Sequence, residues 1–258
     1  MVKLLKCKML LISILSLLIS NSLILTDVVG LEYGVGVNKN DELIWKCKVS
    51  NNLELDNLFG SDWDNGGIFN NISKGSMMKW KIYNIETNSS LIKIEVDIWF
   101  WIKDLNWGVK DNETQITYLT DPNNYSAGLS FINYKSLVPF WFPMPVGEYM
   151  GGLKLNPWYD VDNRVLPTLN VDIKKNGIFP GYPNENLKII AIYNDQGILN
   201  SYKLYTKDNM VILDIAYDFL PFYVIPTIVI LVSIFTIGII IYIIKKNKSS
   251  KNQLMPRK

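Results

Sequence analysis

Hydrophobic and polar side chains alternate along much of the region 31–218, most clearly in the stretch 91–102. Every second position there is hydrophobic, namely Ile92, Ile94, Val96, Ile98, Phe100 and Ile102. Successive side chains of a strand point to opposite faces of a sheet, so this period of two predicts a long half-buried strand. Trp99 and Trp101 are expected on its otherwise polar face.

The same alternation predicts several further strands, at 45–49, 78–82, 187–193, 198–206 and 210–217. The polar connections at 194–197 and 207–209 are typical of hairpin turns, so the last three strands should form a meander. Short helices are expected around 56–59 and 146–153. We therefore expect an all-β, mainly antiparallel domain, with a curved sheet or a half-barrel as its candidate forms.

Both ends of the chain predict membrane targeting. Residues 1–30 join three lysines to a serine-diluted hydrophobic stretch, as in a signal peptide, with an uncleaved anchor helix as the alternative. Residues 222–244 contain no charge and are long enough to cross a bilayer as one transmembrane helix. The tail 245–258 carries six basic and no acidic side chains, which predicts a cytoplasmic location. We expect a single-pass cell-membrane protein with the domain 31–218 outside.

Composition and charge exclude several classes of function. The chain has no histidine and two cysteines, so histidine-dependent nucleophiles and zinc sites built from histidines or four cysteines are excluded. No metal site or cofactor is predicted. The net charge is +2, of which residues 1–8 contribute +3 and the tail +6, which leaves −7 for residues 9–244. An acidic domain argues against a nucleic-acid partner.

The best candidate for a binding site is aromatic. Residues 137–146 form an apolar run broken by prolines, which fits neither a regular helix nor a central strand. One interpretation is that this run covers an open edge or end of the sheet. The other is that it binds an apolar ligand or lies in the membrane interface. The candidate ligand-binding residues are Trp99, Trp101, Phe140, Trp141, Phe142 and Met144.

Modification sites form a second group of candidates. The motif Asn-X-Ser/Thr occurs four times in the first half of the domain, at Asn71, Asn88, Asn112 and Asn124. These are expected glycosylation sites if the host glycosylates surface proteins. Cys47 alternates with hydrophobic neighbours and is expected in the core, with an intermolecular disulfide as the alternative.

Three short segments are similar to surface proteins of archaeal type. The segment 33–45, with Asn40-Asp41 before Trp45, resembles the first strand of uncharacterised single-pass surface proteins, in which a G-D-x-x-x-W/Y strand follows a signal peptide. Asn40 stands where glycine is usual. Residues 74–82 resemble their second strand, and 193–205 resemble a hairpin found in them and in curved-sheet lipoprotein carriers. The resemblance implies a fold and no activity.

Three functions are consistent with these patterns. The first is a non-enzymatic binding or structural ectodomain that meets a surface protein partner. The second is a carrier-like curved sheet that holds a lipid or another apolar ligand beside the membrane, with residues 137–146 as its lid. The third is a carboxylate-based hydrolase. We expect the first, and therefore no enzymatic activity.

Overall fold

The computed structural model describes residues 32–104, 106–132, 135–175, 183, 185–218 and 229–242. The chain divides into the units Met1–Tyr33 and Gly34–Lys258, and the sheet belongs to the second. The expected signal peptide and basic tail lie outside the described residues, as do both ends of the expected span 222–244. Residues 229–242 are helical. Within the described ranges, no helix is both long enough and apolar enough to cross a membrane.

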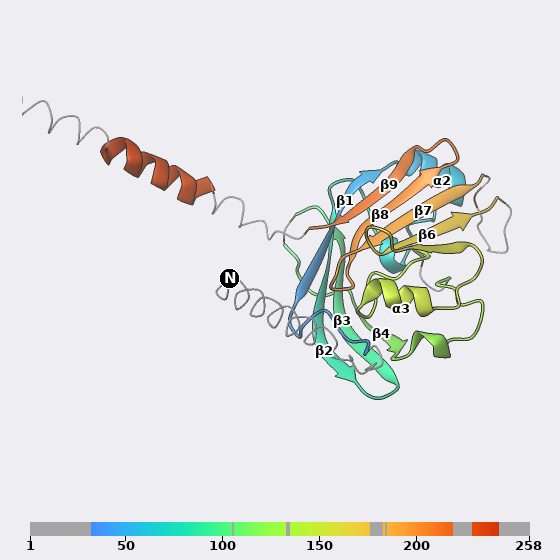
Figure 1. Ribbon diagram of the computed structural model, residues 1–258. Coiled ribbons are helices and arrows are strands. Elements are labelled where there is room, and N and C mark those ends of the chain that lie inside the picture. The colour runs from blue at the N-terminus through green and yellow to red at the C-terminus, as the bar shows by residue number, and fades with distance from the viewer. Residues whose placement is uncertain are drawn as a thin grey trace, which may run out of the picture. The chain divides into compact units, whose positions relative to one another are not determined.

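The described part of the domain is one open, curved, antiparallel sheet of nine strands (Figure 1). The strands are β1 (Glu42–Ser50), β2 (Met77–Thr87), β3 (Leu91–Ile102), β4 (Asn112–Leu119), β5 (Tyr159–Asp162), β6 (Thr168–Ile173), β7 (Leu187–Tyr193), β8 (Leu199–Thr206) and β9 (Val211–Tyr217). Their order is β4-β3-β2-β1-β9-β8-β7-β6-β5. The expected all-β, mainly antiparallel class is therefore confirmed.

Two meanders make up this sheet. Strands β1 to β4 run outward to one edge of the sheet, and strands β5 to β9 return from the other edge. The two meanders join in the middle, where β9 pairs with β1. A long connection, 120–158, joins the two edges and contains α3 (Val146–Gly152) and the 3-10 turn η2 (Pro122–Asn124). Helix α2 (Asn52–Phe59) and the 3-10 turn η1 (Gly67–Phe69) lie between β1 and β2. The helices expected around 56–59 and 146–153 are therefore present.

Turn chemistry builds the expected meander β7-β8-β9. In the β7–β8 turn, the Asn194 side-chain oxygen accepts hydrogen bonds from the backbone N–H groups of Gln196 and Ile198, both at 3.0 Å. Gly197 follows with φ of 84°, a conformation that glycine adopts without steric cost. Asn209 adopts φ of 61° in the β8–β9 turn, where asparagine is tolerated. Both connections therefore close as hairpins.

A β-bulge changes the pattern of β3. Met77 pairs with Ile102, and Lys79 pairs with Trp99. Between these two pairs the chain advances by two residues in β2 and by three residues in β3. One extra residue moves every later side chain to the opposite face. Trp101 is accordingly buried, with 4% of its surface exposed.

The expected face assignment was thus right up to Trp99 and wrong for Phe100, Trp101 and Ile102. Phe100 and Ile102 are half-buried and do not continue the fully buried row, whereas Trp101 joins it. The indole N–H of Trp101 donates a hydrogen bond of 2.7 Å to the Ile68 carbonyl of η1. Trp99 stays on the polar face, as expected.

The core lies on the concave side of the sheet, where the connection 120–158 packs. Aromatic side chains of this connection contact rings from strands of both meanders. Phe140 lies against Trp45 of β1, and Phe142 lies against Tyr193 of β7. A single segment can touch both only where the sheet curls around it. We call residues 137–146 the plug segment and the opposite, solvent-facing side of the sheet the outer face.

Candidate functional site

The six candidate ligand-binding residues occupy three different places. Trp101, Phe140, Trp141 and Phe142 lie in the core, each with 4% or less of its surface exposed. Trp99 is half-buried on the outer face. Met144 is half-buried where the plug segment ends, and its backbone pairs with that of Gly34. The structure therefore does not gather the six into one site.

Aromatic rings surround the plug segment. The Phe140 ring lies 5.1 Å from the Trp45 ring and 5.6 Å from the Trp80 ring, measured between centroids. Trp141 contacts the Tyr118 ring at 5.7 Å, and Phe142 contacts the Tyr193 ring at 5.0 Å. Most of these contacts are edge-on, the favourable geometry for ring quadrupoles. Protein side chains thus fill the space around the plug segment.

Hydrogen bonds hold the backbone of the plug segment in this position. Its prolines cannot donate, but its buried carbonyls still need donors. The hydroxyl of Tyr193 donates to the Pro139 carbonyl and that of Tyr118 to the Trp141 carbonyl, each at 2.8 Å. The Phe142 N–H donates to the Gly197 carbonyl at 2.8 Å. A side chain at Gly197 would overlap the Phe142 carbonyl, so glycine is needed there for close approach.

Cys47 shares this interior. It is a free thiol with no exposed surface, as expected for a core residue. Burial, and secondarily the charge of Asp214, raises the pKa of the thiol to about 12. The neutral thiol is a poor nucleophile, so Cys47 serves packing in this environment.

Comparison with known proteins found no matching family model, no similar curated protein and no similar solved structure. The resemblance to archaeal-type surface proteins and to lipoprotein carriers stays a prediction.

The outer face contains a lysine enclosed by two tryptophans. Lys79 of β2 is 7% exposed, and its Nζ lies 4.1 Å from the centre of the Trp99 ring and 5.0 Å from that of Trp107. A Glu42 carboxylate oxygen lies 3.5 Å from the same nitrogen. Two ring faces and one carboxylate offset the loss of water around this cation. Trp107 comes from the connection between β3 and β4, which is thereby held against the sheet.

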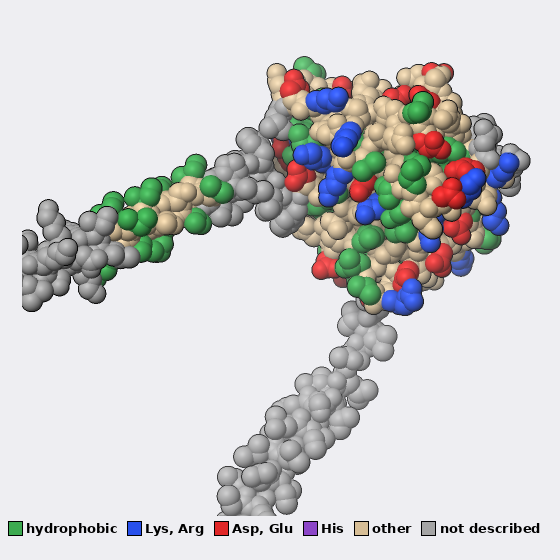
Figure 2. Space-filling model, turned by 90° about the horizontal axis from the view of Figure 1, so that it is seen from above, with side chains coloured by type: hydrophobic (Ala, Val, Ile, Leu, Met, Phe, Trp, Pro, Cys, Tyr) green, Lys and Arg blue, Asp and Glu red, His purple; other side chains and the backbone are tan. Residues whose placement is uncertain are grey.

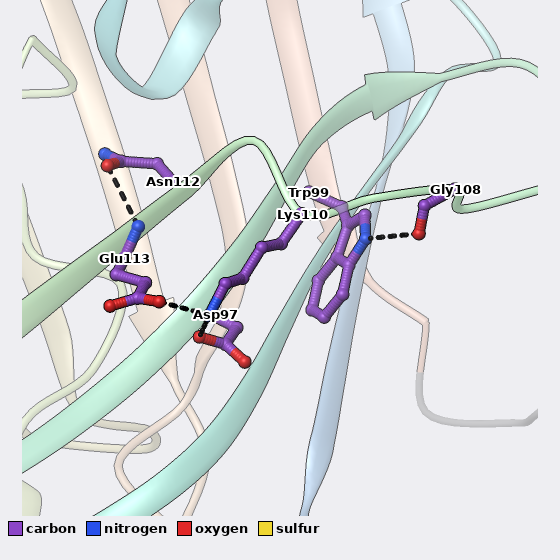
Figure 3. Close-up of polar contacts among 6 residues, drawn as sticks. All are labelled: Asp97, Trp99, Gly108, Lys110, Asn112 and Glu113. Carbon is purple, nitrogen blue, oxygen red and sulfur yellow. Dashed lines mark hydrogen bonds and ion pairs between the residues drawn. The ribbon is translucent and has the colours of Figure 1, made fainter.

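Further polar contacts fix this β3–β4 connection (Figure 3). The indole N–H of Trp99 donates to the Gly108 carbonyl at 3.3 Å. The ammonium of Lys110 lies between two carboxylates, at 2.9 Å from Asp97 and in contact with Glu113. These carboxylates face each other across β3 and β4, so the lysine relieves their repulsion. Hydrogen bonds from Lys110 to Glu113 and Asp97 raise the pKa of its ammonium to about 12.

Paired charges continue along the outer face of these strands. Lys93 lies 2.8 Å from both Glu86 and Glu95, and those hydrogen bonds raise the pKa of the lysine to about 12. Asn84 donates to the same two carboxylates. The face of the domain shown in Figure 2 likewise carries acidic and basic side chains interspersed with hydrophobic ones. Such a pattern suits recognition of a matching surface better than binding of one uniformly charged polymer.

Sequence reasoning missed Lys79, Trp107 and Lys110. Alternation placed Lys79 on the polar face, but the rings that enclose it come from the next strand and from the connection after it. The sequence did contain one indication of this cluster. Trp99 lies on an otherwise polar face, and a second tryptophan, Trp107, follows it closely in the sequence. A tryptophan on a charged face indicates a cation partner, which only the strand pairing identifies.

An open hollow of mixed polar and apolar lining lies beside α3. It measures about 450 Å³ and is lined by Pro145, Val146, Gly147, Glu148, Gly151, Asn163, Pro167 and Asp195. The Asn163 amide donates to the Gly147 carbonyl at 2.8 Å and closes one wall. This open hollow, with its glycines and carboxylates, differs from the enclosed apolar cavity that an apolar ligand requires.

The four expected glycosylation sites all have exposed asparagines. Asn88 lies in the β2–β3 hairpin, Asn112 at the start of the edge strand β4, Asn124 in η2 and Asn71 just after η1. An exposed turn or edge position is compatible with a glycan. Their use stays a prediction.

Proposed function

We propose that the chain is a cell-surface protein held by one membrane span at 222–244, whose β domain acts by binding or structural contact and not by catalysis. The observation that carries this proposal is the plug segment. Phe140, Trp141 and Phe142 occupy the concave side, the place where a carrier of this shape would hold its ligand. A filled concave side leaves the outer surface for interaction.

The best-defined contact surface is the outer face of β2–β4 with the β3–β4 connection. A rigid sheet and the enclosed Lys79 position this connection, and loops on a rigid scaffold often carry binding residues. Val109 of this connection is 88% exposed and lies next to the paired Lys110. Half-buried tryptophans such as Trp107 are frequent anchors of protein interfaces.

The support for the membrane anchor comes from the sequence. The uncharged stretch 222–244 has the length of a transmembrane helix, and the basic tail beyond it follows the positive-inside rule. The acidic character of the rest of the chain suits a partner with complementary charges and disfavours nucleic acid.

Native mass spectrometry tests whether the domain acts by contact or as a carrier. The chain is secreted from a lipid-rich host in a form that ends at Asp218, and its mass is recorded before and after organic extraction. We expect the protein mass alone in both samples, apart from any glycans. An extractable apolar mass bound in stoichiometric amount, and retained in the outer-face variant Trp99→Ser, would contradict the proposal and establish the carrier.

A further inference from the structure

The end of the sheet from which the chain leaves toward its expected span carries an apolar loop. Ala216 of β9 pairs with Ser201, which pairs with Ile192, which pairs with Thr168, which pairs with Asp162. One row of residues therefore crosses the five strands from β9 to β5. These two strands run in the same direction because four antiparallel pairings separate them, so both leave the sheet on the same side of this row.

Residues 163–167, which we call the β5–β6 loop, extend beyond this row. Val165 at its tip is 91% exposed, more than the other large hydrophobic side chains of the described residues, and Leu166 is 46% exposed. Together with Ile192 they line an open hollow of about 380 Å³. Exposed aliphatic side chains at a loop tip are costly in water unless another phase or partner covers them.

One cation accompanies the apolar tip. The side chain of Arg164 is 87% exposed, and its guanidinium lies 2.6 Å from Asp162. The hydrogen bonds from Arg164 lower the pKa of that carboxyl to about 2, so Asp162 stays ionised and is neutralised by its partner. The loop thus presents two aliphatic side chains without a net charge, a composition suited to a lipid interface.

Chain length ties this end of the sheet to the bilayer. β9 ends at Tyr217, and three residues separate Asp218 from Phe222, where the expected span begins. An extended chain covers at most about 3.6 Å per residue, so Asp218 lies within about 14 Å of the hydrocarbon boundary. The β5–β6 loop leaves the same row four strands away, roughly 19 Å across the sheet. In an orientation of the domain that sets the row from β9 to β5 parallel to the bilayer, this loop lies at the depth of the lipid headgroups.

We propose that the β5–β6 loop rests in the interface of the membrane that anchors the chain, with Val165 and Leu166 at the boundary between headgroups and acyl chains. This inference rests on the proposed membrane anchor. The loop acts as a second contact with the bilayer, and it fixes the tilt of the domain, so that the outer face of β2–β4 is presented in one orientation.

Other exposed hydrophobic side chains lie at the opposite end of β9 and provide matched controls. Leu53 of α2 is 75% exposed, and α2 begins where the Asn51 N–H donates to the Ile212 carbonyl at the start of β9. Met210, 47% exposed, directly precedes β9. The length of β9, on the order of 20 Å, separates both from the exit of the chain.

The experiment uses the full chain, reconstituted into phosphatidylcholine vesicles. An environment-sensitive fluorophore is attached through Val165→Cys, or through Leu53→Cys or Met210→Cys as controls, in a Cys7→Ser background. Cys47 is buried and its thiol has a pKa of about 12, so it escapes labelling. Phosphatidylcholine with a nitroxide near the headgroup is then added as the quencher, and flotation of the vesicles is measured in parallel.

We expect the chain to float with the vesicles and the label at 165 to be quenched at least about threefold more strongly than the labels at 53 and 210. Flotation with equal quenching at all three positions would contradict the contact of the loop with the membrane, while it would agree with the membrane anchor. Failure to float would overturn the anchor, and with it the inference.

Discussion

The two sides of the sheet use tryptophan in different ways. On the concave side, Trp45 and Trp141 are fully buried, and their neighbours are other rings and backbone carbonyls. On the outer face, Trp99 and Trp107 are half-buried and enclose the ammonium of Lys79. Aromatic density in a sequence therefore does not distinguish a core from a site. The groups that the rings contact do distinguish the two.

The two sides also differ in how much they should stabilise the fold. Buried rings contribute through the removal of large apolar surfaces from water and through close packing. The outer face depends mainly on exposed ion pairs, whose net contribution is small because water already solvates both partners. The fold should accordingly tolerate changes on the outer face and not in the plug segment.

The largest effect is expected from Phe142→Ala. This side chain is fully buried among Tyr118, Tyr193 and Phe131, so its removal leaves a cavity in a closely packed interior. Truncation of a buried phenylalanine costs about 3–5 kcal/mol of unfolding free energy. Urea unfolding of the form that ends at Asp218, followed by tryptophan fluorescence, measures the loss.

Trp99→Ala is the control from the outer face. It removes one ring from Lys79 but opens no internal cavity, so we expect a loss of about 1 kcal/mol. Similar losses for the two variants would contradict the division of the molecule into a packed side and a solvent-facing side.

Much of the sheet could be predicted from the sequence because its causes are local. The period of two in 91–98 and the turn residues around Asn194 and Asn209 act within a few neighbouring positions, and the structure confirms the strands and hairpins that they indicate. The bulge in β3 is different. Trp101 faces the core because β3 has one residue more than β2 between matched pairs, which no pattern within β3 reveals.

The site could be predicted only as a pair of alternatives. The composition of residues 137–146 suits a covering segment and a ligand-binding loop equally, because both bury aromatic side chains. What distinguishes them is where their contacts come from. Phe140 meets β1 and β2, whereas Phe142 meets β7, and these pairings join parts of the chain that are far apart in sequence. The same holds for Trp107 and Lys79.

A matched pair of substitutions on the concave side should give an intermediate effect. The rings of Trp45 and Trp80 touch at 5.1 Å, and both are buried. The indole N–H of Trp45 donates to the Leu199 carbonyl at 2.7 Å, whereas that of Trp80 is buried without a partner among the described residues. Trp45→Phe loses a hydrogen bond, and Trp80→Phe removes an unsatisfied donor. We therefore expect Trp45→Phe to be the more destabilising by about 2 kcal/mol.

Urea unfolding of the two variants under the same conditions checks this difference. Each substitution keeps a ring beside Phe140 and removes a similar volume, so the cavity terms largely cancel. Equal losses of unfolding free energy would contradict this prediction. They would show that the hydrogen bond from Trp45 to Leu199 adds no measurable stability.

The smallest effect is expected at Lys110. Its pKa is raised to about 12 by Glu113 and Asp97, so the folded state holds this proton more tightly than the unfolded chain, in which lysine titrates near 10.5. The resulting stabilisation is complete below about pH 10.5 and is lost as the pH rises toward 12. Because the ion pair is exposed, Lys110→Met should change the unfolding midpoint at pH 7 by no more than the error of the measurement.

NMR titration of the Lys110 ammonium detects the pairing itself, which stability measurements cannot resolve. Glu113→Gln removes the larger cause of the shift and should lower the pKa toward 10.5, while Asp97 keeps part of it. A strongly destabilised Lys110→Met at pH 7 would mean that the β3–β4 connection is part of the structural core. The outer face would then be a second packed side, and the surface that we assign to partners would have to be sought elsewhere on the domain.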